Sequence, residues 1–166
     1  MTKKLELDSA DEFRAAMRRW ATGVTIVTAQ NGTVRHGMTV SSFTSLSLEP
    51  PLVMVSLEQT ASTTRLIQSS GAFGVSILAD DQRVISDRFA GRIIEISDKF
   101  AGLEWTTLIT GAPLLVNALA GFDCRVVSSH TVGTHILFIG EVLALRSTNN
   151  SNPLIYFERD YHQVVK

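Results

Sequence analysis

The stretch from residue 24 to residue 43 constrains the fold more than any other part of the chain. Residues 24–29 are rich in β-branched side chains, residues 34–43 form a second run, and Asn31-Gly32 lies between them. Asparagine and glycine both tolerate the positive φ angles of a tight two-residue turn, so the pattern predicts a β-hairpin. A hairpin pairs its strands antiparallel, which disfavours a doubly wound parallel sheet.

Further strands and helices follow from short apolar runs that end at glycine, proline or polar residues. We expect strands at 52–57, 73–78, 118–126, 135–146 and 153–157, and helices at 62–70 and 80–90 with Asp80 or Asp81 as the cap. Residues 91–111 show the least periodicity and are expected to form a loop with short helical turns. About seven strands with inserted helices indicate a mainly β fold with peripheral helices, an antiparallel barrel.

The first helix is predicted from its cap and its apolar stripe. Ser9 followed by Glu12 matches a capping box. Apolar side chains then recur at helical spacing, at Phe13, Ala16, Met17 and Trp20. The stripe predicts a packed face, and we expect Trp20 in the core.

Composition limits the classes of protein that the chain can represent. The 166 residues are 45% apolar and 19% charged, which suits a single globular domain over residues 1–166. A formal charge of −1 gives no basic surface for nucleic acid, so no nucleic-acid partner is expected. The mean hydropathy of +0.16 hints at apolar surface that an oligomer would cover.

The sequence also limits where the protein can be located and whether it can bind a metal. The single Cys124 excludes an intramolecular disulfide framework and a cysteine-based zinc site. The N-terminal residues lack a signal-peptide pattern, and no apolar run approaches the roughly 20 residues of a membrane span. The four histidines lack i, i+4 spacing, so no metal site is supported. We therefore expect a cytoplasmic protein with no membrane partner.

Three polar segments are candidates for binding chemistry. Residues 37–45 are mostly small or hydroxyl-bearing, residues 58–65 place hydroxyl groups and Arg65 at a helix start, and residues 130–135 put a histidine beside a glycine at a strand start. A helix start favours phosphate because its backbone N–H groups are free. Each segment also has an ordinary structural explanation: a Ser/Thr-rich strand edge, a helix cap and a turn histidine.

Taken in order, these segments resemble the flavin reductase family with the FMN-binding split-barrel fold. The similarity spans about residues 12–160, and its matching segments are FR (13–14), ATGVTIVT (21–28), GMTVSSF (37–43), SLSLEPPL (45–52), RFAG (88–91), GTH (133–135) and FIGEV (138–142).

The resemblance implies an antiparallel split β-barrel and an NAD(P)H-dependent reductase of FMN or FAD. Such an enzyme transfers hydride from nicotinamide to flavin N5 and supplies reduced flavin to a partner monooxygenase, typically as a homodimer. The alternative is a flavin carrier or redox sensor without nicotinamide-dependent turnover. A purely structural β-barrel interaction module is a third alternative. The choice between FMN and FAD and the choice between NADH and NADPH stay open. NADPH would need a cation near its 2′-phosphate, and the candidates are Arg14, Arg18, Arg83, Arg88 and Arg92.

The resemblance also implies functional residues. The ring would lie along residues 39–42, the ribityl chain and phosphate near Ser42 and residues 62–63, and the RFAG segment over the flavin. The implied cofactor-binding residues are Met38, Thr39, Val40, Ser41, Ser42, Ser56, Ser62, Thr63, Arg65, Phe89 and Ala90. His135 would lie by the nicotinamide as the catalytic residue. The family commonly has Gly-Asp-His there, and this chain has Thr134 in place of the aspartate, a change that motivates the carrier alternative.

Three other residues are not counted among the implied site residues. Cys124 lies on the apolar side of an alternating strand and is expected in the core. His36 is expected to be an exposed turn residue, although it precedes the ring segment. His162 is a weak candidate for a contact across a dimer interface.

Overall fold

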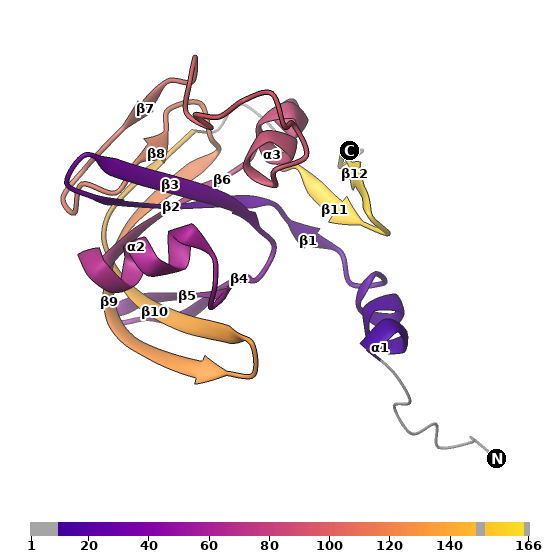
Figure 1. Ribbon diagram of the computed structural model, residues 1–166, viewed down its shortest axis with the longest axis horizontal. Coiled ribbons are helices and arrows are strands. Elements are labelled where there is room, and N and C mark those ends of the chain that lie inside the picture. Colours follow the sequence, from indigo (N-terminus) through magenta and orange to yellow (C-terminus); the bar gives the residue numbers. More distant parts are fainter. Residues whose placement is uncertain (1–9, 149–151, 165–166) are drawn as a thin grey trace.

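A seven-stranded antiparallel sheet forms the body of the protein (Figure 1). The computed structural model describes residues 10–148 and 152–164. The strand order is β3-β2-β6-β9-β10-β5-β4. In chain order the strands are β2 (Thr25–Asn31), β3 (Val34–Val40), β4 (Phe43–Leu48), β5 (Pro51–Glu58), β6 (Ala72–Ile77), β9 (Ala120–Val132) and β10 (His135–Ser147). The prediction of a mainly β, antiparallel fold is confirmed.

The two edge strands of the sheet, β3 and β4, are consecutive in the chain and meet at residues 41–42. The predicted hairpin is present, with Asn31 opposite Val34 and Gly32 at a φ of 59°. The single strand predicted over residues 34–43 is wrong, because the chain turns after β3. The Ser42 hydroxyl donates to the Ser56 carbonyl at 2.7 Å, and the Ser56 N–H donates to the Ser42 carbonyl at 3.2 Å. These two hydrogen bonds hold the corner between β3 and β4 against β5.

Three helices and several short strands complete the described chain. The helices are α1 (Ala10–Met17), α2 (Ser62–Ser70) and α3 (Arg83–Phe89), and the short strands are β1 (Thr22–Gly23), β7 (Trp105–Thr106), β8 (Leu114–Leu115), β11 (Ile155–Phe157) and β12 (Asp160–His162). Strand β1 pairs with the β11–β12 hairpin in a small separate sheet. Within residues 10–148 and 152–164, no helix is both long enough and apolar enough to cross a membrane.

The end of α2 and the start of α3 are set by backbone conformation and hydrogen bonds at single residues. Helix α2 ends at Gly71, which has a φ of 70°, as predicted. Helix α3 begins later than predicted, because Gln82 is its N-cap. The Gln82 side chain accepts from the Ala79 N–H at 2.9 Å and donates to the Asn117 carbonyl at 3.0 Å. Those bonds fix the chain before the helix, so neither Asp80 nor Asp81 caps it.

The core has two clusters. One gathers inside the curved sheet under α2, and its largest members include Val55, Ile67, Phe73 and Phe138. The other lies under α3 and the loop after it, around Ile26, Leu78, Phe89 and Phe100. Cys124 belongs to the first cluster, which confirms its core assignment, and burial raises the pKa of its thiol to about 12.

One glycine is needed where β10 crosses the first cluster. A Cβ atom at Gly140 would lie 2.5 Å from the Phe73 ring and 3.0 Å from the Cβ of Cys124. No side chain fits at that distance without displacing a buried ring, so the FIGEV segment keeps glycine for close packing.

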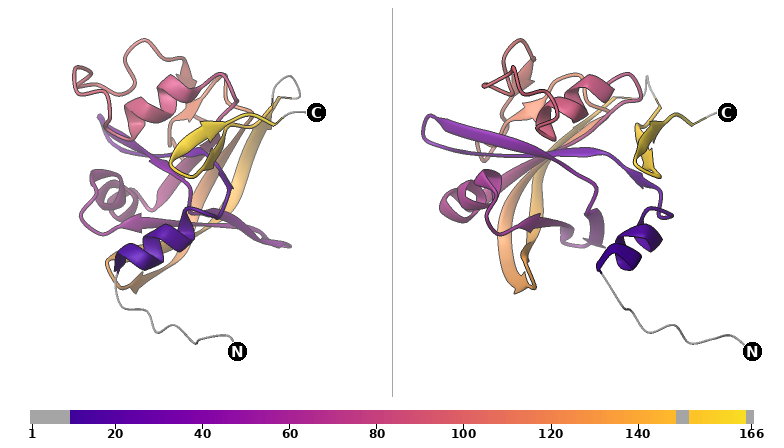
Figure 2. Two further views of the ribbon diagram at one scale, coloured as in Figure 1. Left: turned by 90° about the vertical axis from the view of Figure 1, so that its right-hand side faces the viewer. Right: turned by 45° about the vertical axis from the view of Figure 1, so that its right-hand side comes forward.

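Helix α1 contradicts the packing predicted from its apolar stripe. Phe13, Met17 and Trp20 are 55%, 49% and 68% exposed, and no residue of α1 is buried. Figures 1 and 2 show the helix standing away from the main sheet. Among the described residues nothing buries the stripe, so the core placement of Trp20 is wrong. The predicted cap residue, Ser9, lies outside the described residues.

Candidate functional site

Strand β3 carries the segment on which the ring of a ligand is expected. Met38 packs on the core and Val40 is buried in it, so their side chains are occupied. Thr39 faces the other way, and its hydroxyl donates to the Ser86 carbonyl in α3 at 2.6 Å. Because β3 is an edge strand paired only with β2 in the described chain, its outer backbone groups remain available to a ligand.

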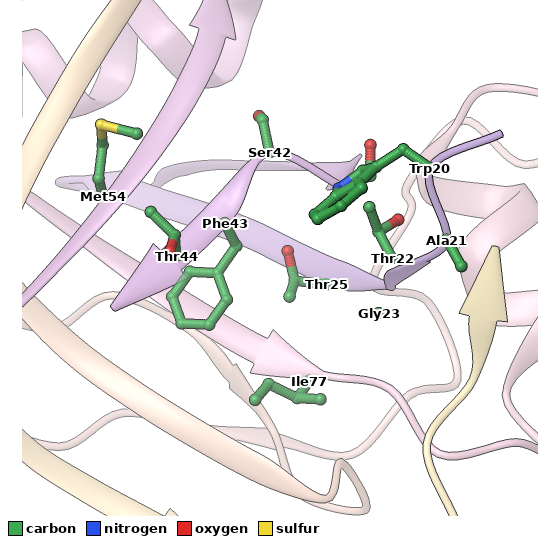
Figure 3. Close-up of a pocket in the computed structure, with 11 residues that line it drawn as sticks. Trp20, Ala21, Thr22, Gly23, Thr25, Ser42, Phe43, Thr44, Met54 and Ile77 are labelled. Carbon is green, nitrogen blue, oxygen red and sulfur yellow. The ribbon is translucent and has the colours of Figure 1, made fainter. Parts of the chain in front are cut away.

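A cavity adjoins Ser41 and Ser42, at the corner between β3 and β4 (Figure 3). Its volume is about 420 Å³. Apolar side chains and threonine hydroxyls line it together, among them Trp20, Thr25, Phe43 and Met54. Apolar walls with a few hydroxyl groups suit a flat heteroaromatic ring. Trp20, predicted in the core, stands instead at this cavity.

The start of α2 is open to an anion. Its N-cap is Ala61, which makes no capping hydrogen bond, so the alternative of an ordinary side-chain cap is wrong. The first-turn N–H groups of a helix have no partner within the helix, and they favour phosphate. Arg65 folds back over this turn, donating to the Thr60 carbonyl at 2.6 Å and to the Ser62 hydroxyl at 3.1 Å.

His36 connects β3 to the start of α2. Its Nδ1 lies 2.8 Å from the hydroxyl of Thr63, which is fully buried. The expectation of an exposed turn histidine is wrong, because His36 lies within β3 and is half-buried where α2 packs on that strand. Burial lowers the pKa of His36, and the charges of Lys99 and Arg65 lower it further. His36 is therefore neutral at pH 7.

Lys99 adds a second cation that the sequence did not reveal. Its ammonium group donates to the Phe89 carbonyl at 2.9 Å, and burial lowers its pKa. Lys99, His36 and Arg65 form no ion pair with a carboxylate within residues 10–148 and 152–164. Arg65 at the open helix start and Lys99, whose charge acts on His36, are cations without acidic partners, and they favour an anion there. Lys99 lies in the aperiodic stretch, where no pattern marks it.

Phe89 and Ala90 have different environments. The Phe89 ring is buried, meets the Phe100 ring edge-on with centroids 5.2 Å apart, and lies against Gly37. Its side chain therefore packs α3 onto β3, and the backbone carbonyl is the part that holds Lys99. Ala90 is exposed and lines a smaller cavity beside Thr39.

His135 begins β10 on a firmly held turn. Its Nδ1 lies 3.0 Å from the Thr134 hydroxyl. Gln59 holds the turn twice, because its N–H donates to the Thr134 carbonyl at 3.0 Å and its side chain donates to the Gly133 carbonyl at 2.8 Å. Since Gln59 leads from β5 into α2, the histidine is fixed beside the approach to that helix.

The strand register brings these separate segments together. His135 lies opposite Glu58, and Leu137 lies opposite Ser56. Ser56 in turn exchanges hydrogen bonds with Ser42. Two residues along a strand span about 7 Å, so His135 lies near the corner at residues 41–42. One strip of the surface thus joins His135, Ser56, Ser42 and the start of α2.

The strip suits a ligand that has both a flat ring and a phosphate. The edge of β3 and the adjoining cavity suit the ring, and the open helix start with its basic neighbours suits the phosphate. FMN and FAD have that chemistry, so the residues present fit the cofactor that the resemblance implied. The antiparallel barrel and the candidate flavin site together define a flavin-binding protein of the split-barrel type.

Comparison with known proteins gives the family. The model of the flavin reductase like domain matches residues 17–165. The FMN reductase (NADH) RutF of Stutzerimonas stutzeri is 38% identical over 152 residues, which are 92% of this chain and 87% of the relative. The chain therefore belongs to the flavin reductase like family.

Two solved structures resemble the fold closely. The styrene monooxygenase flavin reductase SMOB of Pseudomonas putida S12 has a TM-score of 0.82 and 38% identity, over 93% of this chain and 98% of that one. The NADH:FAD oxidoreductase SgcE6 of Streptomyces globisporus C-1027, solved in complex with NAD and FAD fragments, has a TM-score of 0.87 and 28% identity, over 97% of this chain and 98% of that one. The split-barrel fold is thereby confirmed.

Proposed function

We propose that this protein is an NAD(P)H-dependent flavin reductase that passes hydride from nicotinamide to FMN or FAD. One observation carries the proposal: the hydroxyl-rich corner at residues 41–42 is bonded to β5, and β5 leads through Gln59 to both the held His135 turn and the open start of α2. A phosphorylated ring compound fits this order of groups. Relatives named FMN reductase (NADH) and NADH:FAD oxidoreductase support the same reaction.

The geometry supports the following proposed residue roles. The backbone of Thr39 and the corner residues 41–42 hold the ring, and Ser56 supports the corner. Ser62, Thr63 and Arg65 hold the phosphate, and His36 and Lys99 add basic groups beside it. Ala90 closes the ring site from α3, with Phe89 anchoring that helix.

The proposed chemistry needs no catalytic acid–base pair. The flavin ring accepts hydride at N5, and the transfer requires alignment and exclusion of water rather than a protein proton donor. The chain's contribution is positioning: the edge of β3 orients one ring, and His135 orients the other. Because Gln59 holds the turn by two hydrogen bonds, the histidine needs little reorganisation to do so.

Thr134 bears on the alternative of a flavin carrier. The aspartate common in the family is missing, but the Thr134 hydroxyl is hydrogen-bonded to His135 Nδ1 at 3.0 Å. This bond orients the imidazole without a carboxylate, which supports turnover over passive binding. The change removes one negative charge from the nicotinamide side of the site.

We also propose two partners. The names of relatives, a styrene monooxygenase flavin reductase and a flavin-dependent monooxygenase reductase subunit among them, support delivery of reduced flavin to an oxygenase. The exposed stripe of Phe13 and Met17 on α1 and Trp20 just after it supports a homodimer in which a second copy covers it. His162 is exposed and bonds to the Phe157 carbonyl, and its contact with a second copy stays a prediction.

The role of His135 is tested by replacing it with alanine. If the imidazole aligns the nicotinamide, His135→Ala lowers the rate of flavin reduction by about tenfold or more while the flavin Kd changes less than about twofold. His130→Ala is the matched control, because His130 is an exposed histidine on the same hairpin. Equal loss of flavin affinity and reduction rate would contradict the proposed role.

A further inference from the structure

Arg35 on β3 holds the turn that carries Lys99. Its guanidinium donates to the Asp98 carboxylate at 3.2 Å, and its Cζ lies 5.2 Å from the centroid of the Phe100 ring and 4.9 Å from that of Trp105. Asp98 and Phe100 are the two chain neighbours of Lys99. Arg35 therefore contacts the chain on both sides of the lysine. We call its contacts with Asp98, Phe100 and Trp105 the Arg35 tether.

Asp98 joins the turn to β3 because its two carboxylate oxygens have different partners. Oδ1 accepts from the Phe100 N–H at 3.0 Å, and Oδ2 accepts from Arg35. The Asp98 carbonyl also accepts from the Ala101 N–H at 3.0 Å. One oxygen thus closes the turn at residues 98–101, and the other binds that closed turn to the strand.

The position of Lys99 depends on tertiary contacts of this kind. The chain between α3 and β7 contains no helix or strand that would fix it. The Arg35 Nε is buried and has no acceptor among the described residues, so the two aromatic rings cover part of the cation. A cation over aromatic rings is attracted more strongly when it is desolvated, whereas a fully exposed ion pair contributes little. The Arg35 tether is therefore stronger than a surface ion pair.

The residue after Arg35 connects the same strand to the proposed phosphate site. Side chains alternate along a strand, so His36 faces away from Arg35, and its Nδ1 lies 2.8 Å from the Thr63 hydroxyl in the first turn of α2. Burial lowers the pKa of His36, and the charge of Lys99 lowers it further. The Lys99 ammonium thus lies within electrostatic reach of the start of α2. A displaced turn would carry this charge away from it.

We propose that Arg35 is a positioning residue for phosphate binding: by holding Asp98 and Phe100, it keeps the Lys99 ammonium at the phosphate of the bound flavin. This inference rests on the proposed function, in which Lys99 is a basic group beside that phosphate. Arg35 acts through the turn and does not touch the ligand, because Asp98 and two rings occupy its guanidinium. The tether makes no contact with the flavin ring, so a flavin without phosphate does not depend on it.

The test measures the Kd of FMN and of riboflavin, which lacks the phosphate, by fluorescence titration of wild type, Arg35→Met and Asp98→Asn. Both substitutions break the ion pair, whereas the new amide oxygen at position 98 can still accept from the Phe100 N–H. We expect each to weaken FMN binding about fivefold and to leave riboflavin binding unchanged. A purely long-range charge effect predicts the opposite sign for Asp98→Asn, because removing a negative charge tightens the binding of an anion.

Lys99→Met shows whether the tether acts through the lysine. Alone it weakens FMN binding about tenfold, and adding Arg35→Met causes no further loss, because the positioned charge is already gone. Wild-type FMN affinity in Lys99→Met, or a further loss in the double variant, overturns the proposal. Arg125→Met and Glu141→Gln are matched controls that leave FMN binding unchanged, since they break a similar ion pair, 2.6 Å long, between β9 and β10.

The remaining outcomes separate this proposal from the proposed function. Equal losses of FMN and riboflavin affinity in Arg35→Met overturn it, because the tether then serves only the fold. Wild-type FMN affinity in both Arg35→Met and Asp98→Asn, or tighter FMN binding by Asp98→Asn, overturns it and leaves the reductase proposal intact. If Arg35→Met loses its cooperative thermal transition, Asp98→Asn decides. A wild-type protein that binds neither FMN nor riboflavin contradicts the proposed function itself.

Discussion

Lys99 holds its ammonium group against the Phe89 carbonyl, and its charge acts on His36, whose Nδ1 lies 2.8 Å from the Thr63 hydroxyl in the first turn of α2. No carboxylate in the described chain pairs with it, so a bound phosphate would be its first anionic partner. We expect Lys99→Met to weaken FMN binding about tenfold, the usual size of one lost charge-assisted contact. Riboflavin, which has no phosphate, should bind the variant as it binds wild type.

Fluorescence titration with FMN and riboflavin measures both affinities. Arg125→Met is the control, since Arg125 is a cation on β9 that pairs with Glu141. A variant that loses riboflavin and FMN affinity equally would show that Lys99 acts through the fold and not on the phosphate.

His36 gives the protein a specific pH dependence of stability. Burial, and then the charges of Lys99 and Arg65, lower its pKa below the unfolded value of 6.5. Between the folded and unfolded pKa values the unfolded chain binds more protons, so His36 contributes stability above pH 6.5 that is lost as the pH falls through the folded pKa.

Thermal melts between pH 7.5 and about pH 5 test this contribution. We expect the melting temperature of the ligand-free protein to fall more steeply in wild type than in His36→Gln, whose amide can still bond to Thr63. Parallel curves for the two proteins would mean that the pH dependence comes from other groups.

At the scale of single elements, α1 is the feature that the chain leaves uncovered. Phe13 and Met17 on α1 and Trp20 just after it form an exposed stripe, and no residue of α1 is buried. If a second copy covers the stripe, Met17→Glu places a charge in the interface and weakens the dimer by at least about tenfold. Because Met17 is not buried within the chain, the monomer should keep its fold.

Sedimentation equilibrium of wild type and Met17→Glu measures the association, with circular dichroism as the test of folding. Val84→Glu is the control, because Val84 is also exposed on a helix, at 61%. A wild-type protein that sediments as a monomer at all concentrations would contradict the homodimer.

Local signals in the sequence predicted most of the elements, but not how they pack. Asn31-Gly32 specified its hairpin and Gly71 ended α2, because each depends on backbone conformation at one or two residues. The exposure of Trp20 and the burial of His36 depend on which surfaces meet, which no local pattern records. The same holds for the split of residues 34–43, caused by the bonds between Ser42 and Ser56.

The whole molecule joins three segments that are distant in the chain into one candidate site. In the order β3-β2-β6-β9-β10-β5-β4, β3 and β4 are the two edge strands, and only residues 41–42 connect them. The sheet therefore curls until its two edges approach each other at this connection. Pairing of β10 with β5 then brings His135 beside the segment leading into α2. The ordered motifs predicted these residues through the family resemblance, whereas Lys99 and the Arg35 tether emerge only from tertiary packing.

Stopped-flow mixing of the protein with each pairing of FMN or FAD and NADH or NADPH tests the reductase proposal most directly. The flavin's visible absorbance follows its reduction under anaerobic conditions. We predict bleaching at least about a hundredfold faster with protein than without it for at least one pairing, since alignment of two rings supplies a gain of that order. Bleaching no faster than the protein-free rate with all four pairings, in a protein that binds flavin and is bleached by dithionite, would contradict a reductase and select the carrier.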